Sequence, residues 1–344
     1  MTTTIKDIAK ASGVSVATVS QVLGNGGRPV HPQTRLRVIS AAQTLDYTPN
    51  AVARGLVQKR MNTIGLVFLH GDIPAHSNPF LMGVLDGVLS VSTRRDQRMM
   101  LCTLPRWETA GDHVSDFSDG RCDGVLLLVP PAGCPLVTQL QHRKVPFVVV
   151  NGGDCFGQVP HIDIDNVQAA FEMTQHLLSL GHRRIGFVHR QTEWEFPFAA
   201  ERQQGYREAM TAAGCYDPAL ARLDADEMMP FDLNGYGRPT ALFCCFDALA
   251  LTVLEALRQQ GVRVPEEVSV VGFDDIPGAA TCTPGLTTMR QPMTEIGEQA
   301  AEKLLALIDG RTVVEPFTVL ATEFISRQST APPPSQCATV SALL

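Results

Sequence analysis

Residues 4–25 read TIKDIAKASGVSVATVSQVLGN, and this stretch predicts two short helices joined by a tight turn. Thr4 followed by Asp7 has the spacing of a capping box, so a helix is expected to begin directly after Thr4. Gly13 can adopt the positive φ that the turn needs, and Ser15 is expected to cap the second helix. The stretch therefore predicts a helix-turn-helix motif.

A third helix is predicted to complete a small helical head. It would begin near Pro32, because proline is favoured in the first turn of a helix. Leu36, Ile39 and Leu45 would form its apolar stripe, which continues to Tyr47.

Charge is distributed unevenly along the 344-residue chain. The net charge is −7, yet residues 1–60 hold eight basic and two acidic side chains, a net of +6, which leaves −13 on the rest. A basic head on an acidic body indicates local contact with phosphates. A merely solvated basic face would produce the same count.

The remaining composition is that of a globular chain, with 44% hydrophobic and 18% charged residues. No apolar run reaches the roughly 18 residues of a membrane span. The first residues lack the apolar core of a signal peptide, so we expect a cytoplasmic protein without membrane contact. The nine cysteines show no CxxC or zinc-ligand spacing, so neither a cofactor nor a metal is expected.

From residue 63 onward, apolar strand-like runs alternate with helical patterns. The runs are 63–68, 124–129, 146–150, 184–189, 241–246 and 268–273. The helical patterns between or after them are 80–95, 167–180, 200–213, 248–260 and 294–309. Such alternation predicts an α/β core with parallel sheets covered on both faces, and its length predicts two lobes.

Two other classes of protein compete with a DNA-binding one. Two-lobed α/β chains are often enzymes, but GxxxxGK[ST], GxSxG, HExxH and GxGxxG are absent, so an enzyme is not expected. The glycine-rich stretch 24–27 follows a helix rather than a strand, which disfavours a phosphate-binding loop. A transport-type binding protein would need export, which the N-terminal residues do not support.

Several stretches resemble the lactose-repressor (LacI/GalR) family. The stretches are TIKDIAKASGVSVATVSQVLGN, YTPNAVARGL, TIGLVF, SNPF, LGHRRIGFV, VSVVGFDDIP, LTTMRQP and ISRQSTAPP, in order from about residue 3 to 333. The resemblance implies a transcription regulator, expected to be a repressor. It would bind near-palindromic double-stranded operator DNA as a homodimer, under the control of a small-molecule effector, a sugar or sugar derivative.

The resemblance also implies a domain organisation. A helix-turn-helix domain would span 1–48, a hinge helix and linker 49–61, an effector-binding and dimerisation core 62–330 and a flexible tail 331–344. The core would resemble periplasmic sugar-binding proteins, with one lobe from 62–162 and 293–320 and the other from 163–290 and 321–330.

The family's DNA contacts correspond to the second helix of the head, with Val16, Ala17, Thr18, Ser20, Gln21 and Asn25. Gln21 is the candidate for a direct base contact, because glutamine pairs most naturally with adenine. Ser20 and Asn25 would position phosphates instead. Many relatives carry a basic residue at the position of Gln21, so their operator preference does not transfer directly.

The hinge is expected to contribute Asn50, Ala53 and Leu56, with Leu56 wedged into the minor groove. A helix this short is marginal in water, and Gly55 weakens it further. DNA and the partner hinge would therefore stabilise it together. A plain surface linker is the alternative.

The resemblance places the effector near Phe80, Asn151, Arg202, Phe246, Asp274 and Gln291. Asn151, Asp247 and Asp274 follow predicted strands, where ligands of α/β sheets bind. The fork of Arg202 suits a carboxylate or paired hydroxyls, and Asp274 would accept from ligand hydroxyls. Alternatively, Arg202 forms a surface salt bridge and Asp274 shapes a turn.

Three aromatic residues leave further alternatives. Phe80 would cover one face of a sugar ring or belong to the core. Phe246 stands where relatives often have asparagine, so a ligand hydrogen bond is replaced by an aromatic face. Trp194 would stack on the effector or pack. The identity of the effector, and whether it induces or corepresses, stay open.

Overall fold

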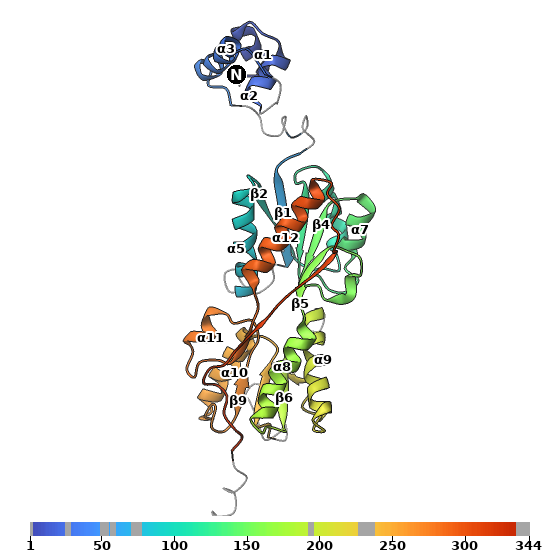
Figure 1. Ribbon diagram of the computed structural model, residues 1–344, viewed down its shortest axis with the longest axis vertical. Coiled ribbons are helices and arrows are strands. Elements are labelled where there is room, and N and C mark those ends of the chain that lie inside the picture. Colours follow the sequence, from blue (N-terminus) through green and yellow to red (C-terminus); the bar gives the residue numbers. More distant parts are fainter. Residues whose placement is uncertain are drawn as a thin grey trace, which may run out of the picture.

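The computed structural model describes residues 3–24, 29–48, 55, 60–69, 78–191, 196–225 and 238–334. It shows a small helical head at one end and a core of two lobes stacked along the long axis (Figure 1). The expected fold class is confirmed. None of the described helices combines the length and apolar character needed to cross a membrane.

The head contains three helices, α1 (Ile5–Ser12), α2 (Val16–Leu23) and α3 (Pro32–Thr44). The predicted caps are present. The Thr4 amide donates to the Asp7 carboxylate at 2.9 Å, and the Ser15 hydroxyl accepts from the Thr18 amide at 3.1 Å. Gly13 makes the turn between α1 and α2 with a φ of 65°.

The three helices bury a small shared core made of Ile8, Ala9, Val19, Val22, Val38 and Ala42. The predicted stripe of α3 is right for Ile39 and Tyr47, which pack against this core, and wrong for Leu36 and Leu45, which are 67% and 37% exposed. Val38 and Ala42 face inward instead. Apolar residues occur on more than one side of α3, and the small Ala42 permits a closer helix contact than a leucine would.

The first lobe is built on a six-stranded parallel sheet in the order β11-β5-β4-β3-β1-β2. Its strands are β1 (Thr63–Leu69), β2 (Arg98–Leu104), β3 (Gly124–Leu128), β4 (Phe147–Val150), β5 (His161–Ile164) and β11 (Phe317–Leu320). One face packs against α5 (Pro79–Arg94) and α12 (Met293–Ile308). The other packs against η2 (Ala110–His113), α6 (Val114–Ser118) and α7 (Pro135–Arg143).

The second lobe is built on a four-stranded parallel sheet in the order β7-β6-β8-β9. Its strands are β6 (Ile185–His189), β7 (Leu223–Asp224), β8 (Ala241–Cys244) and β9 (Ser269–Val271). Helices α8 (Asn166–Ser179) and α9 (Pro197–Ala212) cover one face. Helix α10 (Asp247–Gln259) covers the other, beside α11 (Pro277–Thr281).

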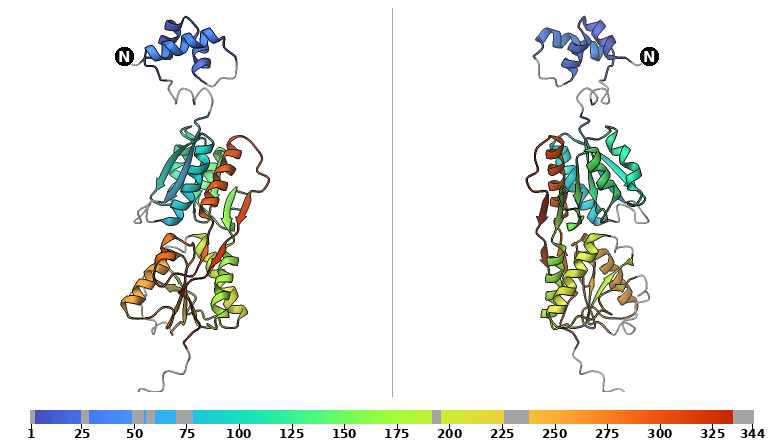
Figure 2. Two further views of the ribbon diagram at one scale, coloured as in Figure 1. Left: turned by 60° about the vertical axis from the view of Figure 1, so that its left-hand side comes forward. Right: turned by 90° about the vertical axis from the view of Figure 1, so that its right-hand side faces the viewer.

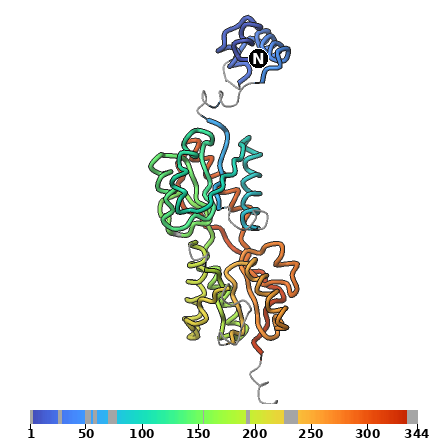
Figure 3. Tube along the Cα trace, turned by 180° about the vertical axis from the view of Figure 1, so that it is seen from behind, coloured from blue at the N-terminus to red at the C-terminus, as the bar shows by residue number. Residues whose placement is uncertain are grey.

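The described chain passes between the two lobes at three places. The first joins β5 to α8, the second joins β10 (Thr288–Arg290) to α12, and the third joins β11 to β12 (Glu323–Ile325). Strands β10 and β12 form an antiparallel pair. Figures 2 and 3 show these segments running alongside one another from lobe to lobe. Both lobes are therefore discontinuous in sequence, while their proposed boundaries stay a prediction.

Candidate effector cavity and DNA-contacting helix

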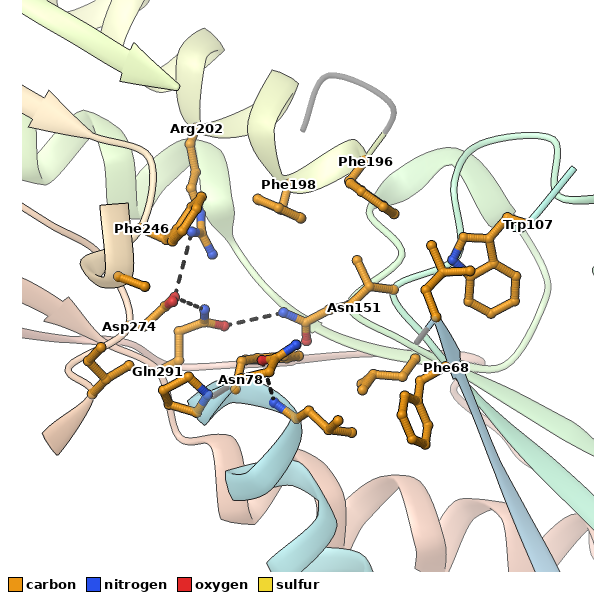
Figure 4. Close-up of a pocket in the computed structure, with 18 residues that line it drawn as sticks. Phe68, Asn78, Trp107, Asn151, Phe196, Phe198, Arg202, Phe246, Asp274 and Gln291 are labelled. Atoms are coloured by element: carbon orange, nitrogen blue, oxygen red, sulfur yellow. Dashed lines mark hydrogen bonds and ion pairs between the residues drawn. The ribbon is translucent and has the colours of Figure 1, made fainter. Parts of the chain in front are cut away.

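A cavity of about 290 Å³ lies between the two lobes (Figure 4). Its lining includes Phe68, Leu69, Asn78, Phe80, Trp107, Val129, Asn151, Phe196, Phe198, Arg202, Phe246, Asp274 and Gln291. Many of these residues lie at or just beyond the carboxyl ends of parallel strands, where ligands of open α/β sheets bind. The six predicted effector residues all line this one cavity.

Sharp backbone turns bring several lining side chains to the cavity. Val129, Asn151 and Asp274 have φ values of 52°, 53° and 122°. Positive φ is uncommon in residues other than glycine, above all in a β-branched residue such as Val129. Such backbone conformations cost about 1–3 kcal/mol each and cluster at functional sites. Their concentration here supports a functional cavity.

A chain of polar contacts crosses the cavity from one lobe to the other. Nη1 of Arg202 lies 3.6 Å from Oδ1 of Asp274, and Nε2 of Gln291 donates to the same oxygen at 2.6 Å. Nδ2 of Asn151 donates to Oε1 of Gln291 at 3.3 Å. These contacts are the dashed lines that join the four residues in Figure 4. Oδ1 of Asn151 is buried without a hydrogen-bond partner among the described residues, so it could accept from a ligand.

Arg202 is held rigidly, and it is not part of a surface salt bridge. It is 2% exposed. Its Nη1 donates to the Cys245 carbonyl at 2.7 Å, and its Nε donates to Oδ1 of Asn166 at 3.0 Å. The guanidinium carbon lies 3.7 Å from the centroid of the Phe273 ring. The guanidinium plane is therefore fixed before a ligand arrives.

Two buried carboxyl groups have different roles in the second lobe. Burial raises the pKa of Asp274, while Arg202 and the hydrogen bond from Gln291 oppose the rise. Burial also raises the pKa of Asp247, and the charge of Asp274 adds to this rise. Asp247 does not line the cavity, contrary to its predicted place at the ligand mouth. It accepts from the Thr288 hydroxyl at 2.6 Å and the Ile276 amide at 3.0 Å, which braces the segment carrying Asp274.

Four aromatic residues of the lining were missed by the sequence reasoning, namely Phe68, Trp107, Phe196 and Phe198. The Phe196 and Phe198 rings are stacked, with centroids 5.9 Å apart. They flank Pro197, which begins α9, so the sequence Phe-Pro-Phe before a helical pattern was the available signal. Phe80 and Phe246 line the cavity and also pack against the core, and Trp194 lies outside the described residues.

The exposed side of α2 carries most of the predicted DNA-contacting residues. Val16, Ala17 and Ser20 are exposed, whereas Thr18 and Gln21 are half-buried. The Thr18 hydroxyl lies 2.9 Å from that of Ser15, so it takes part in capping the helix. DNA contact by this face stays a prediction. The other predicted contacts, Asn25, Asn50, Ala53 and Leu56, lie outside the described residues.

A helix-turn-helix head joined to a two-lobed core with a lined cavity defines a ligand-responsive transcription regulator. Residues 4–50 match the model of bacterial regulatory proteins of the lacI family, and residues 174–330 match the periplasmic binding protein-like domain. The chain is 34% identical over 320 residues to the transcriptional repressor PurR of Vibrio cholerae, which covers 89% of this chain and 91% of PurR. The chain belongs to the lacI family of bacterial regulatory proteins.

Solved structures agree with this fold. The transcriptional regulator CelR in complex with cellobiose has a TM-score of 0.71 and 33% identity, covering 95% of this chain and 99% of CelR. The lac repressor dimer bound to operator and an anti-inducer has a TM-score of 0.82 at 23% identity, covering 96% of this chain and all of that one. The protein is therefore a DNA-binding transcription regulator with an effector-binding core.

Proposed function

We propose that this regulator is a homodimeric repressor whose affinity for a near-palindromic operator is set by a sugar or sugar derivative in the cavity. The observation that carries the proposal is the polar chain from Arg202 through Asp274 and Gln291 to Asn151, flanked by aromatic faces. Cytoplasmic location and the domain limits 1–48, 49–61, 62–330 and 331–344 are part of the same proposal.

The chemistry of the lining supports a hydroxylated ring. A sugar hydroxyl both donates and accepts, so adjacent hydroxyls can pair with the carboxylate of Asp274 and the guanidinium of Arg202. Phe80 and Phe246 would cover the apolar faces of the ring. The cellobiose bound to CelR supports the same class of ligand.

The position of the cavity supports control of DNA binding. A ligand that contacts both lobes stabilises the lobe orientation in which those contacts form. In a dimer, this orientation would set the spacing of the two heads. Effector and operator then change each other's affinity reciprocally.

A two-stage experiment tests the proposal on the full chain. A thermal-shift screen with sugars, sugar acids, sugar phosphates and purines identifies ligands that raise the midpoint of unfolding. Operator fragments selected from a random DNA library are then titrated by fluorescence anisotropy with and without each hit. We expect a sugar-class hit to change operator affinity. Operator binding that no hit alters would contradict effector control through this cavity.

A further inference from the structure

The cavity differs in chemistry between its two ends. Figure 4 places Arg202, Phe246 and Asp274 at one end and Phe68 and Trp107 at the other, with Asn151 between them. The two charged side chains, Arg202 and Asp274, therefore lie at one end of the cavity. The opposite end is lined by Phe68 and Trp107 of the first lobe and Phe196 of the second, and aromatic rings dominate its labelled part.

Trp107 is a fixed part of the apolar end. It is 3% exposed and belongs to a buried cluster with Val67, Leu104 and Val125, against which Leu69 and Phe196 pack. Its indole N–H forms no hydrogen bond within the described part of the chain. Figure 4 shows this nitrogen on the side of the ring that faces the other labelled side chains. The indole therefore offers a flat edge and one donor to a ligand.

These two ends favour different parts of one ligand. A second sugar ring would bring several hydroxyls to the apolar end, and each buried hydroxyl without a partner costs about 1–3 kcal/mol. An aromatic ring brings none, and it gains stacking or edge-to-face contact with Phe68, Trp107 and Phe196. An oxygen that links the two parts of the ligand can accept from the indole N–H.

We propose that the effector is an aryl glycoside. Its sugar ring contacts Arg202 and Asp274, and its aromatic group lies against Phe68, Trp107 and Phe196. This inference rests on the proposed function, because it specifies the sugar derivative that the cavity binds.

Matched glycosides test the inference by calorimetry on the full chain. The methyl and phenyl β-glycosides of glucose, galactose and mannose are titrated beside cellobiose. For the sugar that binds, we expect the phenyl glycoside to bind about tenfold more tightly or better, because a buried phenyl group removes more apolar surface from water than a methyl group.

Two variants locate the aromatic group. Trp107→Leu should reduce the phenyl-to-methyl affinity ratio at least several-fold, and Trp107→Phe should reduce it less because an aromatic ring remains. Phe246→Leu is the matched contrast at the sugar end. It should lower the affinity for both glycosides and leave the phenyl-to-methyl affinity ratio unchanged.

The chain has two tryptophans, so a Trp194→Phe chain carries Trp107 as its single indole. A 4-nitrophenyl glycoside should quench the fluorescence of that indole, and because Trp107 itself is retained, this test does not depend on the folding of any Trp107 variant.

The outcomes separate the two proposals. Methyl and phenyl glycosides of equal affinity, or cellobiose bound more tightly than the phenyl glycoside, would overturn the aryl assignment and leave the sugar proposal standing. A full phenyl preference in Trp107→Leu, or no quenching of Trp107, would overturn the placement. Binding of a free purine but of no glycoside would overturn both proposals.

Discussion

Replacing Asp274 with asparagine isolates the charge at the polar end of the cavity. Asparagine has nearly the same shape, tolerates positive φ better than most residues, and retains an oxygen that can accept from Gln291. It removes the negative charge that lies 3.6 Å from Nη1 of Arg202. Hydrogen bonds to charged groups contribute about 1.5–3 kcal/mol, so a glycoside that donates to Asp274 should bind about 10- to 150-fold more weakly.

The same substitution predicts a pH effect whose sign follows from burial. Burial raises the pKa of Asp274 above its usual value near 3.8. Between the usual and the raised pKa, the folded chain binds more protons than the unfolded chain, so the free energy of unfolding falls as pH rises above about 4. Asparagine has no proton to release, so the variant should lack this part of the decline. The free energy of unfolding of the variant, relative to that of the wild type, should therefore be higher at pH 8 than at pH 4.5.

Calorimetry and thermal unfolding at both pH values check these expectations. Effector binding by the wild type should weaken as pH falls through the raised pKa of Asp274, because a protonated carboxyl is a weaker acceptor. Asp274→Asn should lack this dependence. Asp112→Asn, at an exposed position, is the matched control and should leave both measurements unchanged. Wild-type effector affinity in Asp274→Asn at pH 7.5 would refute the contact, and a stability difference that is the same at both pH values would refute the effect of burial.

The remaining predictions concern the head, the hinge and the fixed arginine. Operator binding, followed by anisotropy, should give a steep negative slope of log K against log salt; a slope near zero would place DNA contact outside the basic head. Gln21→Ala should cost about 1–3 kcal/mol on the preferred operator and relax one symmetric pair of positions, whereas equal weakening on all sequences would indicate a backbone contact. Leu56→Ala should reduce affinity and DNA bending together, and unchanged bending in a gel-shift phasing assay would contradict a wedge. Arg202→Ala should lower the free energy of unfolding by about 3–5 kcal/mol, because it leaves the buried Asp274 without its cation; a wild-type denaturation midpoint would contradict this role.

Features determined by neighbouring residues were predictable from the sequence. The capping box at Thr4 and Asp7, the turn at Gly13 and the cap at Ser15 all depend on contacts within a few residues. The long core helices were predicted to within a few residues, because their apolar spacing spans several turns. Six strands were not predicted, namely β2, β5, β7, β10, β11 and β12. The two or three residues of β7, β10 and β12 carry too little periodicity, and polar residues interrupt the apolar runs of β5 and β11.

The candidate site was predictable only where the family resemblance supplied positions. Arg202, Asp274, Asn151 and Gln291 come from distant parts of the chain, and no local pattern shows that they meet. Asp247 and Asp274 both follow strands of the second lobe, but only the packed structure shows that Asp247 braces a backbone while Asp274 lines the cavity.

The aromatic residues of the lining could not be predicted from local sequence patterns either. Phe68 and Trp107 have the surroundings of ordinary core residues in the sequence. Their edges reach the cavity because of how the strands and loops of the first lobe pack. A count of aromatic residues cannot distinguish a buried ring from one whose edge faces a ligand.

The three passages between the lobes have a consequence for synthesis of the chain. The head is contiguous in sequence and can fold as soon as it leaves the ribosome. Strand β5 pairs with β11, which is synthesised more than 150 residues later, so the first sheet cannot be completed before then. Helix α12, which covers one face of that sheet, also comes late. A nonsense mutation before residue 293 would therefore release an intact DNA-reading unit on a core with an uncovered sheet. Such products should be cleared by proteases or aggregate rather than act as unregulated repressors.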